Sequence, residues 1–216
     1  MTEPLPAALL SATSAIAADA LDALGHRDQA MDSRLRPVDP AMRLVGRAYP
    51  VHVVEDRAVP ERPYEGEMQA LGAMGRGDVG VYAVSGESRA AAWGELFSCA
   101  AIGRGVRGVV VDGCIRDSRQ IQELQYPVFA SDRSPLDTLA RARVDTHGEP
   151  VVCGGRTVRR GDVLVADGDG IVVVPRESVD EVAAFIASKH RLEQGARDDL
   201  VAGASIREVW EKYGVF

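Results

Sequence analysis

The sequence contains few cysteines and few aromatic residues. Its 216 residues include three cysteines, and 5% of the chain is aromatic. Cys99, Cys114 and Cys153 lie far apart and form no C-x-x-C pair, which excludes a zinc ribbon and a thioredoxin-like redox motif. We therefore expect three buried, reduced thiols, as in an intracellular protein.

Features of membrane and nucleic-acid-binding proteins are also missing. No apolar run approaches the roughly 20 residues that a membrane-spanning helix needs. The N-terminal segment carries early acidic residues and no basic stretch, so we expect no signal peptide. The formal net charge of -7 disfavours contact with nucleic acids or with anionic membranes. These absences predict a cytoplasmic protein without a nucleic-acid or membrane partner.

Several catalytic motifs are absent as well. There is no G-x-S-x-G nucleophile elbow and no phosphate-binding loop of the G-x-x-x-x-G-K-[ST] type. Gly103–Gly108 matches G-x-G-x-x-G, but it lies between a predicted helix and the next strand, whereas a dinucleotide site needs the opposite order. The histidines share no spacing, and we expect surface or core positions for them. They are His26, His52, His147 and His190.

The middle of the chain has the pattern of parallel βαβ units. Strands are predicted at 78–84, 106–112 and 127–130, and helices at 90–104 and 118–124. Short links between alternating strands and helices favour a parallel sheet with right-handed connections. The sequence therefore predicts an α/β fold.

Other elements are expected on both sides of this unit. Before it, the pattern predicts a helix at 11–24, a strand at 44–54, a surface loop at 56–66 and a short helix at 67–74. After residue 144, glycine-rich turns separate short strands at 151–153, 157–158, 163–166 and 171–174. Helices follow from 178 to about 195 and at 206–213. We interpret residues 1–216 as one domain with a C-terminal helical arm from about residue 178.

Charged side chains follow two of the predicted strands. Arg116 and Asp117 come shortly after the strand at 106–112, and a helix start at 93–97 follows the strand before it. Ligands in open α/β sheets bind at the carboxyl ends of parallel strands, so both segments face one crevice if these strands are neighbours. Arginine binds carboxylates bidentately, and aspartate offers a hard oxygen to Mg²⁺ or Mn²⁺. This combination indicates a site for a small anionic oxo acid.

The residue pattern alone leaves simpler interpretations open. One alternative is that Arg116 and Asp117 cap a helix and have no other role. Another is that Asp112 shapes a turn and binds nothing. A third alternative is that Glu95 complements the helix dipole in a first helical turn and has no catalytic role.

The segment WGELFSCAAIGRGVRGVVVDGCIRD resembles the core of the class II pyruvate aldolases. This family is typified by 4-hydroxy-4-methyl-2-oxoglutarate/4-carboxy-4-hydroxy-2-oxoadipate aldolase, and its superfamily includes the regulator of ribonuclease E activity. The family pattern is an acid, twenty residues and then Arg-Asp, which Glu95 and the pair Arg116–Asp117 match. The segments SAIAADALDALG and GDVGVYAVSG, the region of short strands and the helical tail are also similar to family elements. The resemblance implies an α/β/β sandwich of the swivelling-domain type.

The resemblance also implies roles for particular residues. It implies a loop that holds a pyruvyl group through backbone N–H groups. That loop consists of Gly94, Glu95, Leu96 and Phe97. Arg116 is expected to bind the pyruvate carboxylate or enolate, and Asp117 to anchor Mg²⁺ or Mn²⁺. The family forms homotrimers or homohexamers with sites between subunits, and Glu193 is our candidate for an acid that assists proton transfer in a neighbouring site.

The expected reaction is metal-dependent cleavage of small 2-oxo acids through a pyruvate enolate. It includes retro-aldol cleavage of 4-hydroxy-2-oxo diacids and decarboxylation of oxaloacetate, and it makes the protein a carbon–carbon lyase. One departure from the family is Glu95, where the aldolases carry aspartate. The alternatives are a non-catalytic ribonuclease E regulator on the same scaffold and an enzyme with a different substrate. Asp117 favours the aldolase, because the regulators generally lack the aspartate of the Arg-Asp pair.

Overall fold

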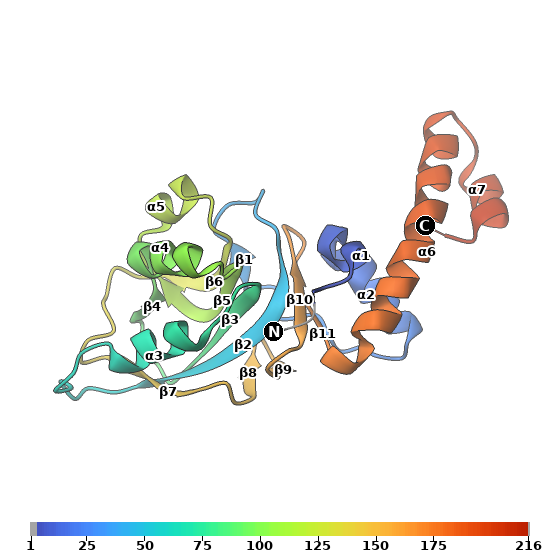
Figure 1. The fold of residues 1–216 in the computed structure, drawn as a ribbon. Coiled ribbons are helices and arrows are strands. Elements are labelled where there is room, and N and C mark those ends of the chain that lie inside the picture. Colours follow the sequence, from blue (N-terminus) through green and yellow to red (C-terminus); the bar gives the residue numbers. More distant parts are fainter. Residues whose placement is uncertain (1–3, 216) are drawn as a thin grey trace.

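The computed structural model describes residues 4–215, and its centre is a nine-stranded mixed sheet (Figure 1). The strand order is β1-β6-β5-β3-β2-β10-β11, with β4 paired to β5 and β7 paired to β2. The parallel strands are β2 (Leu44–Glu55), β3 (Asp78–Ser85), β4 (Ala91–Trp93), β5 (Gly108–Ile115) and β6 (Val128–Arg133). The predicted parallel α/β unit is therefore confirmed.

The remaining strands are antiparallel. In the large sheet they are β1 (Arg36–Pro37), β7 (Ala142–His147), β10 (Val163–Ala166) and β11 (Ile171–Val174). A separate hairpin consists of β8 (Val151–Cys153) and β9 (Arg156–Val158). The sequence prediction missed β1, β4 and β7, and it located β8 to β11 correctly within one residue.

The helices form two groups toward opposite ends of the sheet (Figure 1). Their bounds are α1 (Ala7–Ser11), α2 (Ser14–Ala23), α3 (Glu65–Ala73), α4 (Glu95–Arg104), α5 (Ser118–Glu123), α6 (Val179–Val201) and α7 (Ile206–Tyr213), with a 3₁₀ turn at Arg176–Ser178. In Figure 1, α6 and α7 form an arm that projects beyond β10 and β11, away from α4 and α5. No helix among residues 4–215 is long and apolar enough to cross a membrane.

Three layers define the architecture. Helices α3, α4 and α5 pack on one face of the sheet, around a core that includes Leu71, Trp93 and Ile121. The β8–β9 hairpin packs on the opposite face, where Cys153 and Val158 join the core with Val81. This helix–sheet–hairpin arrangement confirms the α/β/β sandwich of swivelling-domain type and its C-terminal helical arm. The assignment of residues 1–216 to a single domain stays a prediction.

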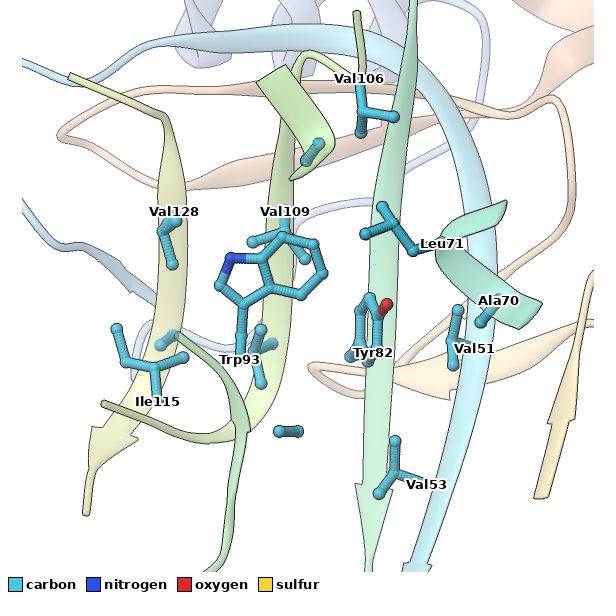
Figure 2. Close-up of a cluster of buried hydrophobic side chains, with 14 of the residues drawn as sticks. Val51, Val53, Ala70, Leu71, Tyr82, Trp93, Val106, Val109, Ile115 and Val128 are labelled. Atoms are coloured by element: carbon cyan, nitrogen blue, oxygen red, sulfur yellow. The ribbon is translucent and has the colours of Figure 1, made fainter. Parts of the chain in front are cut away.

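Trp93 anchors the helical face of the core (Figure 2). Its ring centroid lies 5.3 Å from that of Tyr82, 5.6 Å from Phe97 and 6.4 Å from Tyr126. Its indole N–H donates a 2.9 Å hydrogen bond to Ser98 Oγ, so the buried polar atom is satisfied. Because Trp93 directly precedes the predicted pyruvyl-binding loop, its packing fixes where that loop leaves the core.

Two sequence predictions near this loop are wrong at their boundaries. Ala91–Trp93 forms strand β4 instead of the first turn of a helix, and α4 begins only at Glu95. Strand β5 continues through Gly113 to Ile115, so Asp112 lies within a strand and not in a turn. A Cβ at Gly113 would lie 2.5 Å from Val84 Cγ2, which shows that glycine permits this close strand approach.

Two other predictions also need correction. The helix expected at 11–24 begins only at Ser14, as α2, because the chain is extended at Ala12 and Thr13 caps α2, and the separate helix α1 before it was not predicted. Cys114 and Cys153 are buried, as expected, but Cys99 is exposed on α4. A helix in contact with a sheet has one outer face, and the apolar sequence around Cys99 did not reveal that this residue lies on it.

Candidate active site

The carboxyl end of β5 and the start of α4 meet at one place. Strand β4 pairs with β5, and the register sets Trp93 opposite Ile115. The N–H of Arg116 donates a 3.0 Å hydrogen bond to the carbonyl of Trp93. As a result, Gly94 and Glu95 lie beside Arg116 and Asp117, although twenty residues separate the two segments in the sequence.

Asp117 has a strained backbone and an unusual side-chain direction. Its φ is 58°, in the left-handed region that non-glycine residues rarely adopt. It directly precedes α5, yet its side chain forms no capping hydrogen bond with that helix. Instead, Oδ2 accepts a 3.2 Å hydrogen bond from the N–H of Glu95 and lies 3.6 Å from Nε of Arg116. Asp117 therefore does not cap α5 with its side chain, and its carboxylate instead contacts the first N–H of α4.

Gly94 allows this contact between the two segments. A Cβ built at Gly94 would lie 2.8 Å from Asp117 Oδ2 and 3.2 Å from Arg116 Cγ. The backbone at Gly94 is extended, so its φ does not itself require glycine. Because Gly94 has no side chain, the start of α4 can lie close to the Arg-Asp pair.

A third segment holds the guanidinium of Arg116. Its Nη1 lies 2.7 Å from Oδ2 of Asp137, and Oδ1 of Asp137 accepts 2.8 Å hydrogen bonds from the Tyr64 hydroxyl and the Leu139 N–H. Burial opposes ionisation of Asp137, but the hydrogen bonds from Leu139, Tyr64 and Arg116 outweigh it and lower its pKa. Asp137 is therefore a fixed anion that orients Arg116, and sequence reasoning missed both Asp137 and Tyr64.

Arg116 and Asp117 line a shallow cavity that is open to the surface and has a volume of about 430 Å³. Its lining consists of Ile115, Arg116, Asp117, Ser118, Arg133, Ser134 and Pro135. This volume lies within the range of about 300–1,000 Å³ that is usual for small-molecule sites. Sequence reasoning missed the contribution of Arg133, because it ended the third parallel strand at residue 130. The rule that ligands bind at the carboxyl ends of parallel strands would have found it.

The rest of the predicted loop borders the pair but does not line this cavity. Glu95 is half-buried at the first position of α4, and Leu96 is 77% exposed. The side chain of Phe97 is partly buried and packs against Trp93. Within residues 4–215, no acceptor is found for the N–H groups of Leu96 and Phe97, which are free first-turn donors.

Glu193 is not brought to this site within one chain. It lies on α6, and its carboxylate is 3.6 Å from Lys189 Nζ. Figure 1 shows α6 at the opposite end of the molecule from α4 and α5. A role for Glu193 needs a second copy of the chain, and it stays a prediction.

The expected divalent cation stays a prediction, for which the site offers one carboxylate. Within residues 4–215, no group of three or more His, Cys, Asp or Glu side chains could hold a metal. Asp117 supplies a single carboxylate, which is 37% exposed and whose Oδ1 has no hydrogen-bond partner in the described chain. Mg²⁺ commonly binds one or two carboxylates and keeps several waters. The donor set therefore suits Mg²⁺ or Mn²⁺ and does not suit a closed zinc site.

A second carboxyl group lies buried behind Asp137. Glu67 on α3 is 7% exposed. Burial is the main cause that raises its pKa above the ordinary 4.5, and the charge of Asp137 adds to it, while hydrogen bonds from its own N–H and from Thr138 act in the opposite direction. Its ionised form is therefore less favourable in the folded state than in the unfolded state.

Replacing Glu67 with glutamine is expected to stabilise the protein at neutral pH. The penalty for ionising Glu67 is absent below pH 4.5, where the carboxyl is protonated in both states, and it is fully present above the raised folded-state pKa. The melting temperature of Glu67→Gln should thus exceed that of the wild type at pH 8, and the difference should shrink as the pH approaches 4.5. Glu65→Gln, an exposed change on the same helix, is the control. A pH-independent difference for Glu67→Gln would contradict this account.

The fold and the site define a class of α/β/β proteins with an Arg-Asp pair at the carboxyl end of a parallel strand. A family model described as RraA-like, Aldolase/RraA, matches residues 14–173. The chain therefore belongs to the RraA-like family.

Three known proteins illustrate the similarity. A protein of Methanocaldococcus jannaschii, MJ0644, is 36% identical over 57% of this chain and 59% of its own length. A Halalkalibacterium halodurans protein named "Putative 4-hydroxy-4-methyl-2-oxoglutarate aldolase" is 30% identical over 90% of this chain and 88% of its own length. The crystal structure of Streptomyces coelicolor RraAS2, a member of the RNase ES inhibitor family, has a TM-score of 0.81 and 27% identity, covering 90% of this chain and 97% of that chain.

Coverage differs among the relatives. The chain spans less than two thirds of MJ0644, and it matches only 33% of the length of a further relative, DlpA of Legionella pneumophila. The names of these proteins include both an aldolase and a ribonuclease inhibitor. Family membership alone therefore does not assign an activity.

Proposed function

We propose that the protein is a divalent-metal-dependent carbon–carbon lyase that releases pyruvate from small 2-oxo acids. The substrates are 4-hydroxy-2-oxo diacids, cleaved by retro-aldol reaction, and oxaloacetate, which is decarboxylated. The observation that carries this proposal is the position of Asp117. Its carboxylate is turned away from the helix that it precedes and toward Arg116 and the start of α4, beside a cavity of about 430 Å³.

Each residue of the site has a chemical task in this reaction. Arg116, oriented by Asp137, binds the carboxylate next to the 2-oxo group. The free N–H groups of Leu96 and Phe97 donate hydrogen bonds to oxygen as negative charge develops on it. Asp117 would hold the cation, which would supply Lewis-acid stabilisation of the same charge.

Proton transfer completes the cycle. The 4-hydroxyl proton is removed as the C3–C4 bond breaks, and C3 of the resulting enolate takes up a proton to give pyruvate. Glu95 is half-buried, and its backbone N–H contacts Asp117, so we assign its carboxylate to this proton transfer. Its side chain is one methylene longer than the family aspartate, so its carboxylate reaches farther from the start of α4.

An oligomer is part of the proposal. The arm that carries Glu193 points away from the cavity, so this acid can reach an active site only in another subunit. Glu193 then assists Glu95 across a subunit contact in a homotrimer or homohexamer. Membership of the RraA-like family supports this arrangement, because the resemblance implies sites between subunits.

Metal-dependent formation of pyruvate tests the function directly. Purified protein is incubated with oxaloacetate and Mg²⁺ or Mn²⁺, and pyruvate is measured by coupling to lactate dehydrogenase. We expect pyruvate to form faster than in a control that contains the metal ion without protein. We expect this activity to be lost when a chelator is added. A rate equal to the protein-free control, for oxaloacetate and for a 4-hydroxy-2-oxo diacid, would contradict the lyase and leave the regulator as the better interpretation.

A further inference from the structure

We propose that Arg133 binds the distal carboxylate of the substrate and thereby selects 2-oxo diacids over 2-oxo monoacids. The inference rests on the proposed function for the chemistry of the site. It adds a substrate-binding residue outside the Arg116–Asp117 pair, contributed by a different strand.

The sheet places Arg133 next to the pair. Arg133 is the last residue of β6, and the parallel register aligns it with Ile115, which directly precedes Arg116. Neighbouring strands lie about 4.8 Å apart. The pairing of β5 with β6 is irregular between Val111 and Cys114, so alternation along the strands does not fix the direction of Arg133. The cavity lining does, because Arg133 lines the same cavity as Ile115 and Arg116.

The guanidinium of Arg116 already contacts two carboxylates of the protein. Its Nη1 contacts Asp137 at 2.7 Å, and its Nε lies 3.6 Å from Asp117. In the described part of the chain, only Nη2 of this guanidinium has no partner. A single free nitrogen can serve the carboxylate next to the 2-oxo group but cannot also hold a second one.

Arg133 is the other cationic side chain in the cavity lining. Its backbone N–H contacts the side chain of Asp132, but within residues 4–215 no carboxylate lies within ion-pair distance of its guanidinium. The charge of Arg116 is balanced by two aspartates, whereas that of Arg133 is unbalanced. A substrate with a second carboxylate supplies the missing anion, and a monoacid does not.

A comparison of matched ligands tests this selection. The first measurement is kcat/KM for a 4-hydroxy-2-oxo diacid and for 4-hydroxy-2-oxopentanoate, in the wild type and in Arg133→Ala. The second is equilibrium binding, by calorimetry in Mg²⁺, of 2-oxoglutarate and 2-oxopentanoate. These two ligands share the 2-oxo acid group and differ at the distal carboxylate, and neither has the 4-hydroxyl that cleavage requires.

We expect Arg133→Ala to lower kcat/KM and affinity for the diacids by roughly tenfold to a hundredfold, the usual loss for a hydrogen bond to a charged group. The monoacid values should stay unchanged. Arg133→Lys keeps the charge but loses the planar fork, so it should retain part of the preference. Arg119→Ala, an 87% exposed arginine on α5 outside the cavity lining, should change neither ligand.

The two measurements separate the failure of this inference from the failure of the proposed function. An equal loss for both ligands, or no loss for either, in Arg133→Ala overturns the role of Arg133. The wild type can bind 2-oxoglutarate more tightly than 2-oxopentanoate, lose this preference in Arg133→Ala, and yet cleave no substrate. That result overturns the lyase and supports Arg133 as a diacid-binding residue. Because the Arg133 side chain has no contact that stabilises the described fold, the melting temperature of Arg133→Ala should equal that of the wild type.

Discussion

Loss of Arg116 or of the Asp117 charge is expected to reduce pyruvate formation by at least about 10²- to 10³-fold, the effect of removing one group that stabilises developing negative charge. Arg116→Ala removes the cation that we propose binds the substrate carboxylate. Asp117→Asn removes the charge that we propose holds the metal. Asparagine is preferable to alanine at position 117, because the left-handed φ of 58° is tolerated by asparagine and strained for alanine. It also keeps an oxygen that can accept the hydrogen bond from the Glu95 N–H.

The control for both variants is Arg119→Ala. Arg119 lies three residues after Arg116, and it pairs with Glu123 on the outer face of α5 at 3.0 Å. We expect it to have wild-type activity, and all three variants should keep the oligomeric state of the wild type on gel filtration. Full activity in a folded Arg116→Ala variant would place the active site elsewhere.

Gly94→Ala is expected to reduce kcat by about 10²-fold with little effect on stability. The new Cβ would lie 2.8 Å from Asp117 Oδ2, so the carboxylate or the start of α4 must move. A displacement of about 1 Å at reacting groups can cost about this factor in rate. The backbone of Gly94 is extended, with φ of -162°, so alanine introduces no backbone strain.

The activity of Gly94→Ala should therefore fall while its melting temperature stays close to that of the wild type. Gly103→Ala is the matched control, because a Cβ at Gly103 meets no atom within 4 Å. We expect the control to be as active as the wild type. If Gly94→Ala keeps full activity, the close approach of the two segments is not needed for catalysis.

Prediction from the sequence succeeded for regular elements whose residue pattern is local. The alternation of β-branched strands with small-residue helices predicted β3, β5, β6, α4 and α5, and glycine-rich turns located β8 to β11. The boundaries near the site were wrong, because pairing with β5 draws Ala91–Trp93 into a strand. Such pairing depends on residues more than twenty positions away, and no local propensity encodes it.

In the candidate site, too, local sequence patterns were predicted and contacts between distant segments were not. The spacing between Glu95 and the pair Arg116–Asp117 identified two segments that meet in the structure. The sequence assigned Asp112 to a turn, whereas its carboxylate accepts hydrogen bonds from Arg34 Nη2 at 2.7 Å and from the Gly154 N–H at 2.8 Å. Asp112 thus connects β5 to distant segments, and only the tertiary structure separates this structural aspartate from Asp117, five residues later.

The sequence by itself determined the fold class and the two segments that meet at the Arg-Asp pair, because these depend on residue type and spacing along the chain. The tertiary structure decided which other groups lie beside them. Tyr64 and Asp137 orient Arg116 from two loops, and Arg133 reaches the cavity from the next strand. Contacts between distant segments are set by strand order and register, and a linear pattern of residues does not contain that information.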